Sequence, residues 1–235
     1  MLAILYDIHA NLPALEAVLA DAESAGAERH LLGGDYAALG AWPNETLERL
    51  RELQGPGWLR GNWERWLDNA EGMPDISFIQ RARAWAVEQL DEAIVTELAA
   101  LPMTLSVDGI LFSHASPISD MRSFMPQPAD DERELLESAD GARRLVFGHT
   151  HLQFQRETDD GVELVNPGSV GLPFDGDVRA AYALLHDDGR LELRRVEYDH
   201  ERVAAVVRER ISTFGEDLAQ RLDTASPPPR PPSSA

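Results

Sequence analysis

Short apolar runs separated by polar segments recur along this chain. The first covers residues 2–6, and four more lie at 31–34, 58–61, 110–113 and 145–148. Apolar runs of about four to eight residues bounded by turn-forming residues are typical of buried strands. Between the first two runs, apolar residues follow helical spacing at Leu15, Val18, Leu19 and Ala22. Residues 1–34 therefore predict a strand, a helix and a second strand.

Three hairpins are predicted further along the chain, at 104–112, 153–165 and 181–196, each around a turn that contains Asp-Gly. Residues 65–101 predict mainly helix and an insertion packed over one side of a sheet, whose aromatic residues we interpret as core rather than as a substrate platform. A last helix is predicted from about His200 to Leu222. We expect a single domain over residues 1–224 and a disordered Pro- and Ser-rich tail over 225–235.

Each of the five apolar runs ends in a residue type that binds metal ions: Asp7 with His9, Asp35, Asn62, His114, and His149 with His151. Side chains two residues apart in a strand leave on the same face, so Asp7 and His9 are expected to aim at one point. Carboxylate and imidazole together suit borderline divalent cations. One such pair alone is often a turn or a cap, but five strand ends together indicate a two-metal hydrolase centre.

Structural alternatives exist for three of the polar residues and for one loop. Asn11 stands at a predicted helix start, where it would cap the helix and also contact a phosphate. Asn62 is either a helix cap or a metal ligand, and spacing favours neither. Asp35 follows two glycines, and we favour a bridging ligand over a plain turn. The loop over residues 116–128 begins beside a candidate ligand, so a pocket wall and a plain surface loop are equal alternatives.

Charge and composition limit the classes of molecule that the protein is expected to bind. Lys and Arg total 21 against 41 Asp and Glu, which gives a formal net charge of −20. This charge opposes non-specific binding to nucleic acid or to an anionic membrane, although bound cations would still admit an anionic substrate. With no cysteine in the chain, any metal must sit on oxygen and nitrogen. Because we find neither a signal peptide nor an apolar stretch of about 20 residues, a cytoplasmic protein is the default expectation.

The ordered motifs resemble those of the calcineurin-like metallophosphoesterase superfamily. They are Asp7-x-His9, Gly34-Asp35, Gly61-Asn62, His114 and Gly148-His149-x-His151. Residues 166–171, followed by 175–177 and 179–182, are similar to its small bacterial and archaeal phosphodiesterase branch. The resemblance extends to about Leu222. It implies an α/β fold, a four-layer α/β/β/α sandwich of two mixed sheets flanked by helices, with a dinuclear centre at the strand ends.

The resemblance also implies a ligand set and a reaction. Asp7, His9 and His151 would hold one metal, Asn62, His114 and His149 the other, and Asp35 would bridge them. Of these residues, Asp35, Asn62 and His114 are expected to be catalytic, and Asn11 to bind substrate. Two divalent ions, Mn, Fe, Zn or Ni, would hold a bridging hydroxide that attacks a phosphodiester or a small phosphomonoester.

One residue departs from the family's pattern. The third motif usually reads Gly-Asn-His followed by Asp or Glu, and its histidine is thought to act near the leaving group. Trp63 occupies that position here, and its ring N–H has no usable proton to transfer. Since general acid catalysis is worth about 100- to 10,000-fold, we expect weaker activity on alkyl esters than on aryl phosphates, nucleotides or phosphoanhydrides. Tyr6 also replaces a serine often found before the first motif.

Two other functions compete with the phosphoesterase. A non-catalytic protein-binding scaffold on the same fold is favoured by the change at Trp63 and opposed by the complete ligand set. Protein that neither retains metal nor turns over an aryl phosphate would favour it. A nuclease is opposed by the acidic charge, and a salt-sensitive gel shift with DNA would favour it. The expected partner is a small phosphorylated substrate, and the sequence predicts no oligomeric state.

Overall fold

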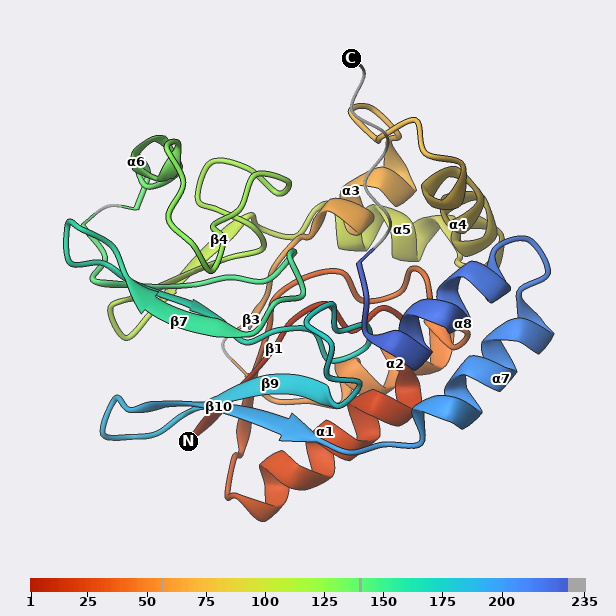
Figure 1. Cartoon of the computed structure of the whole chain (residues 1–235), viewed down its shortest axis with the longest axis horizontal. Coiled ribbons are helices and arrows are strands. Elements are labelled where there is room, and N and C mark those ends of the chain that lie inside the picture. The colour runs from red at the N-terminus through yellow and green to blue at the C-terminus, as the bar shows by residue number, and fades with distance from the viewer. Residues whose placement is uncertain (56, 140, 228–235) are drawn as a thin grey trace.

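Two mixed β-sheets lie face to face at the centre of a computed structural model that describes residues 1–55, 57–139 and 141–227 (Figure 1). The first sheet has the order β10-β9-β1-β2-β3. Strands β1, β2 and β3 are parallel to one another, and β9 and β10 are antiparallel to their neighbours. The strands are β1 (Leu2–Leu5), β2 (Arg29–Leu32), β3 (Gly57–Trp58), β9 (Ala180–Leu185) and β10 (Leu191–Val196).

The second sheet has the order β4-β5-β6-β8-β7. Its parallel centre, β5-β6-β8, is flanked by antiparallel β4 and β7. The pairs β4–β5, β7–β8 and β9–β10 are the three predicted hairpins, which are therefore confirmed. The strands are β4 (Thr104–Val107), β5 (Ile110–Ser113), β6 (Arg144–Val146), β7 (Phe154–Glu157) and β8 (Glu163–Asn166).

Strand β1 is apolar throughout because both of its faces are buried. Leu2 and Ile4 pack in the cluster between the sheets, together with residues of the second sheet such as Phe112. Ala3 and Leu5 point the other way and pack against helices. This alternation explains why the first apolar run of the sequence has no polar position.

Helices cover the outer face of the first sheet, where they build the largest buried cluster. They are α1 (Leu12–Ser24), α2 (Pro43–Arg51), α7 (His200–Arg210) and α8 (Gly215–Thr224). The outer face of the second sheet carries a thinner layer, in which Leu135 of the short helix α6 (Glu132–Leu135) and Phe124 pack on Leu145 and Phe147. The arrangement is the predicted four-layer α/β/β/α sandwich, with its fourth layer reduced to one short helix and loops.

The segment predicted to be a helical insertion contains three helices that group on one side of the molecule (Figure 1). They are α3 (Asn62–Asp68), α4 (Ser77–Gln89) and α5 (Glu92–Ala99). Leu67, Ala82 and Leu98, one from each helix, belong to the same buried cluster as the helices over the first sheet. None of the helices within the described ranges has the length and apolar character needed to cross a membrane.

The prediction of one last helix from His200 to Leu222 is wrong. Helix α7 ends at Arg210 and α8 begins at Gly215. A Cβ atom at Gly215 would lie 2.5 Å from the carbonyl oxygen of Val207, so the chain folds back closely on α7 at a position that only glycine fits. The two helices lie side by side as a result (Figure 1).

The end of the chain is only partly described. Ala225, which the predicted tail included, is buried, caps α8 in a left-handed conformation and accepts a hydrogen bond from the backbone N–H of Gly176. Residues 228–235 of the predicted tail lie outside the described residues. The domain limits of 1–224 stay a prediction.

Tyr6 joins the two sheets at the end of β1. Its hydroxyl donates a hydrogen bond of 3.0 Å to the carbonyl oxygen of Val146 in β6. Cβ atoms at Gly33 and Gly148 would lie 2.1 and 2.5 Å from atoms of the Tyr6 ring. The ring of Tyr6 therefore explains why glycines come shortly before the candidate ligands Asp35 and His149.

We predict that Tyr6→Phe lowers the free energy of unfolding by about 1 kcal/mol, because it removes the hydrogen bond between the sheets and keeps the packing of the ring. Urea denaturation of the variant and the native protein measures this difference. The variant should keep its metal content, since no candidate ligand changes. Unaltered stability, or a loss of bound metal, would contradict this role for Tyr6.

Candidate metal centre

Seven candidate ligands gather at the edge where strands of both sheets end: Asp7, His9, Asp35, Asn62, His114, His149 and His151. Six of them are at least 95% buried, and His149 is half-buried on the side of an adjacent pocket. The five apolar runs of the sequence thus deliver their polar ends to one place. This gathering is what the sequence predicted; the role of each residue stays a prediction.

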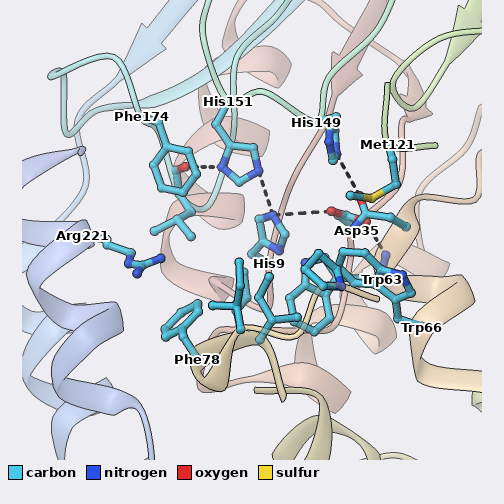
Figure 2. A pocket seen from close by; sticks show the side chains of 16 residues that line it. His9, Asp35, Trp63, Trp66, Phe78, Met121, His149, His151, Phe174 and Arg221 are labelled. Carbon is cyan, nitrogen blue, oxygen red and sulfur yellow. Dashed lines mark hydrogen bonds and ion pairs between the residues drawn. The ribbon is translucent and has the colours of Figure 1, made fainter. Parts of the chain in front are cut away.

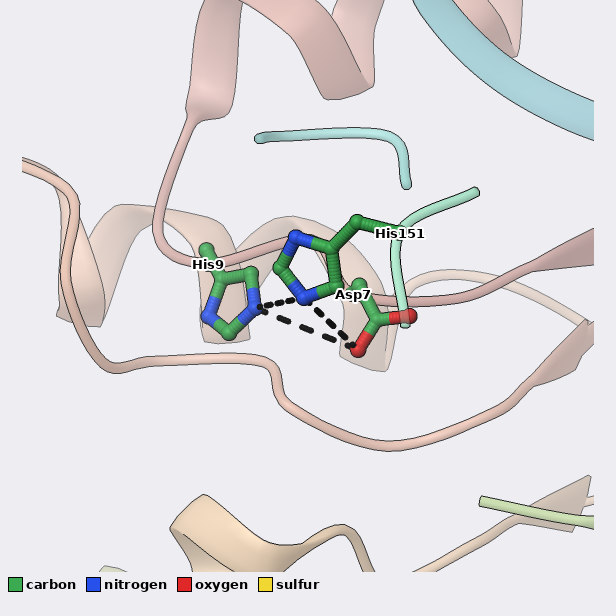
Figure 3. Close-up of side chains that lie close together, drawn as sticks. All are labelled: Asp7, His9 and His151. Atoms are coloured by element: carbon green, nitrogen blue, oxygen red, sulfur yellow. Dashed lines mark hydrogen bonds and ion pairs between the residues drawn. The ribbon is translucent and has the colours of Figure 1, made fainter. Parts of the chain in front are cut away.

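One group of donors consists of Asp7, His9 and His151 (Figure 3). The Nε2 atoms of His9 and His151 lie 3.1 Å apart. The Oδ1 atom of Asp7 is 3.5 Å from Nε2 of His151 and 3.9 Å from Nε2 of His9. Three donor atoms therefore face a common point.

A second group lies beside the first. The Oδ1 atom of Asn62 is 3.0 Å from Nε2 of His114 and 2.9 Å from Nδ1 of His149. The helix cap that was the alternative for Asn62 is excluded, because Gly61 is the N-cap of α3 and Asn62 is its first residue.

Two carboxylates lie between the groups. The Oδ2 atom of Asp35 is 3.4 Å from Nε2 of His114 and 3.8 Å from Nε2 of His9. The Oδ1 atom of Asp7 is also 3.9 Å from Nε2 of His114. The geometry thus fits a bridging Asp35, and it places Asp7 close to both groups as well.

The donors fit divalent cations. The Oδ1 atom of Asp7 is buried and has no hydrogen-bond partner within the described ranges, although an ionised oxygen in that position costs several kcal/mol unless a cation or a donor meets it. The Nδ1 atoms of His114 and His151 face the carbonyl oxygens of Gly33 and Leu172, at 2.9 and 2.5 Å. Each ring must donate there, which leaves its Nε2 lone pair aimed at the centre, as in metal-binding histidines.

Asp7 and His9 do aim at one point, but the expected reason, alternation along a strand, is wrong. Strand β1 ends at Leu5, and both residues adopt left-handed backbone conformations, with φ angles of 53° and 50°. Asp35, His149 and His151 do the same, at 59°, 67° and 59°. Such a conformation costs a non-glycine residue about 1–2 kcal/mol, so the surrounding structure must hold these turns in place.

Residues 166–171, which we call the clamp segment, hold the turn at Asp7. The carbonyl oxygen of Asp7 accepts hydrogen bonds from the Ser169 hydroxyl at 2.7 Å and from the Gly171 N–H at 3.0 Å. Asn166 donates to the carbonyl oxygen of Gly148, next to His149, at 3.0 Å. The clamp segment therefore fixes the first and last ligand loops together.

Glu64 is a site residue that the sequence reasoning did not single out. Its buried carboxylate accepts hydrogen bonds from the backbone N–H groups of Asp35, Gly61 and Tyr36, at 2.8, 2.8 and 2.9 Å. Burial and the charge of Asp35 raise the pKa of Glu64 to about 7, although these donors act in the opposite direction. The signal was present, because Glu64 occupies the last position of the family's third motif.

Asn11 has the helix-cap role predicted for it, and its other side-chain contacts bear on the predicted phosphate contact. It caps α1, where its Oδ1 accepts from the N–H of Ala14 at 3.3 Å. Its side-chain amide donates to the carbonyl oxygen of Gly171 at 2.8 Å and to the Tyr198 hydroxyl at 3.3 Å. Both amide N–H donors are therefore in use, and the predicted phosphate contact has no free donor on this side chain.

An apolar pocket of about 240 Å³ opens beside the centre (Figure 2). Trp66 and Phe78 of the insertion line it, so the interpretation of these aromatic residues as core alone is incomplete. Met121 lines it too, which favours the pocket-wall alternative for the loop at 116–128. The sequence carried no signal for Trp66 and Phe78, because their spacing is also that of ordinary core residues.

The electrostatics differ between His9 and His114. Burial and the neighbouring His151 lower the pKa of His9 to about 4, with Asp35 and Asp7 acting in the opposite direction, so its ring is neutral at pH 7. Burial alone would lower the pKa of His114, but Asp35 and Asp7 raise it to about 10. In the metal-free protein, His114 is thus the imidazolium that faces the two carboxylates.

For the metal-free protein, we predict that stability falls as the pH is lowered from about 6.5 to about 4. The pKa of His9 is about 4 when folded, and the pKa of an unfolded histidine is about 6.5. The unfolded chain therefore binds more protons in this range. His9→Asn removes that titration and suits the left-handed backbone, so its stability should vary less steeply, by up to about 1.4 kcal/mol per pH unit. Urea denaturation at several pH values measures both slopes, and equal slopes would contradict the assignment.

Comparison with known proteins finds a matching family model, a relative by sequence and solved structures of similar fold. The family model described as the calcineurin-like phosphoesterase superfamily domain matches residues 1–190. An uncharacterized protein of Methanocaldococcus jannaschii is 31% identical over 225 residues, which covers 85% of this chain and 88% of the relative. A metallophosphoesterase from Sphaerobacter thermophilus is 27% identical, with 95% of this chain and 98% of that structure covered and a TM-score of 0.79. A hypothetical protein from Pyrococcus horikoshii OT3, at 20% identity, shares the fold, with 97% and 100% covered and a TM-score of 0.82.

Proposed function

The chain belongs to the calcineurin-like phosphoesterase superfamily, and on that basis we propose that it is a dinuclear metal-dependent phosphoesterase acting on phosphodiesters or small phosphomonoesters. The observation that carries the proposal is the pair of buried donor groups that share carboxylates, with Oδ1 of Asp7 left without a partner among the described residues. Asp7, His9 and His151 would hold one ion, Asn62, His114 and His149 the other, and Asp35 both.

When bound, two divalent ions would supply an activated water and would neutralise charge on the phosphoryl group. The chain's own residues decide where that group can sit. Asp35 and Asn62 line the pocket, together with His9, His149 and His151, so a phosphoryl group can reach them. His114 and Asp7 are buried behind them. Of the three predicted catalytic residues, His114 is therefore assigned a ligand role without contact to substrate.

Proton donors are scarce in the pocket. Among the described residues that line it, the titratable ones are four candidate ligands and Arg221, which keeps its proton. Trp63 stands beside the ligands, where its ring packs edge-on against Trp66 at 5.3 Å between centroids. A leaving group here must depart without general acid assistance, which favours aryl phosphates and anhydrides over alkyl esters.

We expect Asp35→Asn to remove most of the bound metal and to lower kcat on an aryl phosphate by at least about 100-fold, because the shared charge between the donor groups is lost. Asparagine tolerates the left-handed backbone at this position, so the fold should persist. Metal analysis and an assay with added Mn test this. The control is Asp21→Asn. Asp21 lies on α1, away from the centre, and its carboxylate forms an ion pair with Arg194 of β10. Full metal content and activity in Asp35→Asn would refute the proposal.

Trp63→His should restore a proton donor near the leaving group. We expect kcat/KM on an alkyl phosphate to rise by up to about 100-fold relative to an aryl phosphate, since only the poorer leaving group needs the proton. Trp63→Phe, which supplies no proton, is the matched control. A histidine variant that changes both substrates by the same factor would show that Trp63 does not occupy a general acid position.

The alternative of a non-catalytic scaffold rests on Trp63, because a protein without catalytic activity would tolerate loss of the general acid at this position. Loss of catalysis gives no reason to retain seven converging donors, among which Asp35, His114 and His151 each have an orienting hydrogen bond to the backbone. Protein that retains metal and hydrolyses no phosphate ester, diester or anhydride would support the scaffold.

A further inference from the structure

The pocket beside the centre is built by two helices and two loops. Trp63 and Trp66 come from α3, Phe78 from α4, Met121 from the loop after β5, and Phe174 from the loop after the clamp segment. Figure 2 shows these side chains around one cavity, with His9 and His151 at its inner wall. Ile76, at the rim, is 45% exposed, so the apolar surface continues to the mouth of the pocket.

The lining is aromatic and flat beside the ligands. The ring of Phe174 stacks on that of His151, with a centroid distance of 4.4 Å and an interplanar angle of 14°. Trp63 and Trp66 supply two more large rings on the other side of His9 (Figure 2). Aromatic rings prefer other aromatic rings as stacked or edge-on partners, worth about 0.5–1.5 kcal/mol beyond the area they bury. A flat ring therefore suits this pocket better than an alkyl chain.

Arg221 is the one cation that reaches this pocket from the described residues. It enters from α8 (Figure 2), and the carbon of its guanidinium lies 4.0 Å from the centroid of the Phe78 ring. Its side chain is half-buried and makes no hydrogen bond or ion pair with any residue in the described ranges, whereas Arg208 on the neighbouring helix pairs with Glu216 and Asp223. Burial lowers the pKa of Arg221, with Asp217 opposing, and its N–H donors have no hydrogen-bond partner among the described residues.

We propose that the substrate is a phosphoester whose leaving group is a flat aromatic ring carrying a second anionic group, and that Arg221 binds this anion. The inference deepens the proposed function and rests on it. Hydrolysis adds the oxygen of water to phosphorus, and the leaving oxygen keeps the electron pair of the broken P–O bond as a phenolate, while the protons of water pass to solvent and to phosphate. Such a leaving group needs no acid, which agrees with tryptophan at position 63.

Binding of inert analogues to the metal-loaded full chain tests this without turnover. The probes are phenylphosphonate, its meta- and para-carboxylated forms, and an alkylphosphonate of similar size, measured by calorimetry. We expect the native protein to bind one carboxylated form about tenfold more tightly than phenylphosphonate, as for a hydrogen-bonded ion pair in a partly buried site. Arg221→Met should lose this preference and keep its affinity for phenylphosphonate. Arg221→Lys should recover part of it.

Arg202→Met is the matched control, since Arg202 is an exposed arginine on α7 outside the pocket, and it should keep the preference. No preference in the native protein, a preference that survives in Arg221→Met, or tighter binding of the alkylphosphonate would overturn the inference. The corresponding phosphate esters separate the two proposals. Hydrolysis with no preference for a carboxylated ring contradicts the inference alone. A preference in binding without hydrolysis of any ester contradicts the proposed function and supports the anion contact.

Discussion

Backbone strain at the candidate ligands is the constraint on which the site depends. Five of the seven have positive φ angles that side chains of L-residues adopt at a cost. The turns persist because neighbouring loops hydrogen-bond to them. The N–H of His9 donates to the carbonyl oxygen of Asp35, and the clamp segment donates two hydrogen bonds to the carbonyl oxygen of Asp7. Strain that is so concentrated, and so thoroughly supported by contacts from elsewhere in the chain, is typical of functional sites.

The same constraint reaches into the fold. The ligand loops can approach each other only because Gly33 and Gly148 leave room for the ring of Tyr6, which also links the two sheets. At Gly61 a Cβ atom would lie 2.2 Å from Oδ1 of Asp35, so the loop that brings Asn62 to the centre also requires glycine. The same few residues therefore determine both the packing between the sheets and the placement of the candidate ligands.

The sequence predicted the strands that end at the site and the set of candidate ligands, because these ligands follow the apolar runs. It did not predict how the ligands converge, since a left-handed turn at Asp7 or His151 depends on contacts with loops far away in the chain. The aromatic wall of the pocket was missed for a similar reason: Trp66 and Phe78 have the spacing of core residues, and only tertiary packing leaves a cavity beside them. The helical spacing of apolar residues likewise predicted one C-terminal helix, where close approach of Gly215 to α7 gives two.

The most direct test of the central claim is anomalous diffraction from crystals of the full chain grown with Mn. The account predicts two peaks separated by about 3.5–4 Å. One should lie among Asp7, His9 and His151, the other among Asn62, His114 and His149, with Asp35 in contact with both. A single peak, or none within reach of these side chains in crystals that hold the metal elsewhere, would contradict it.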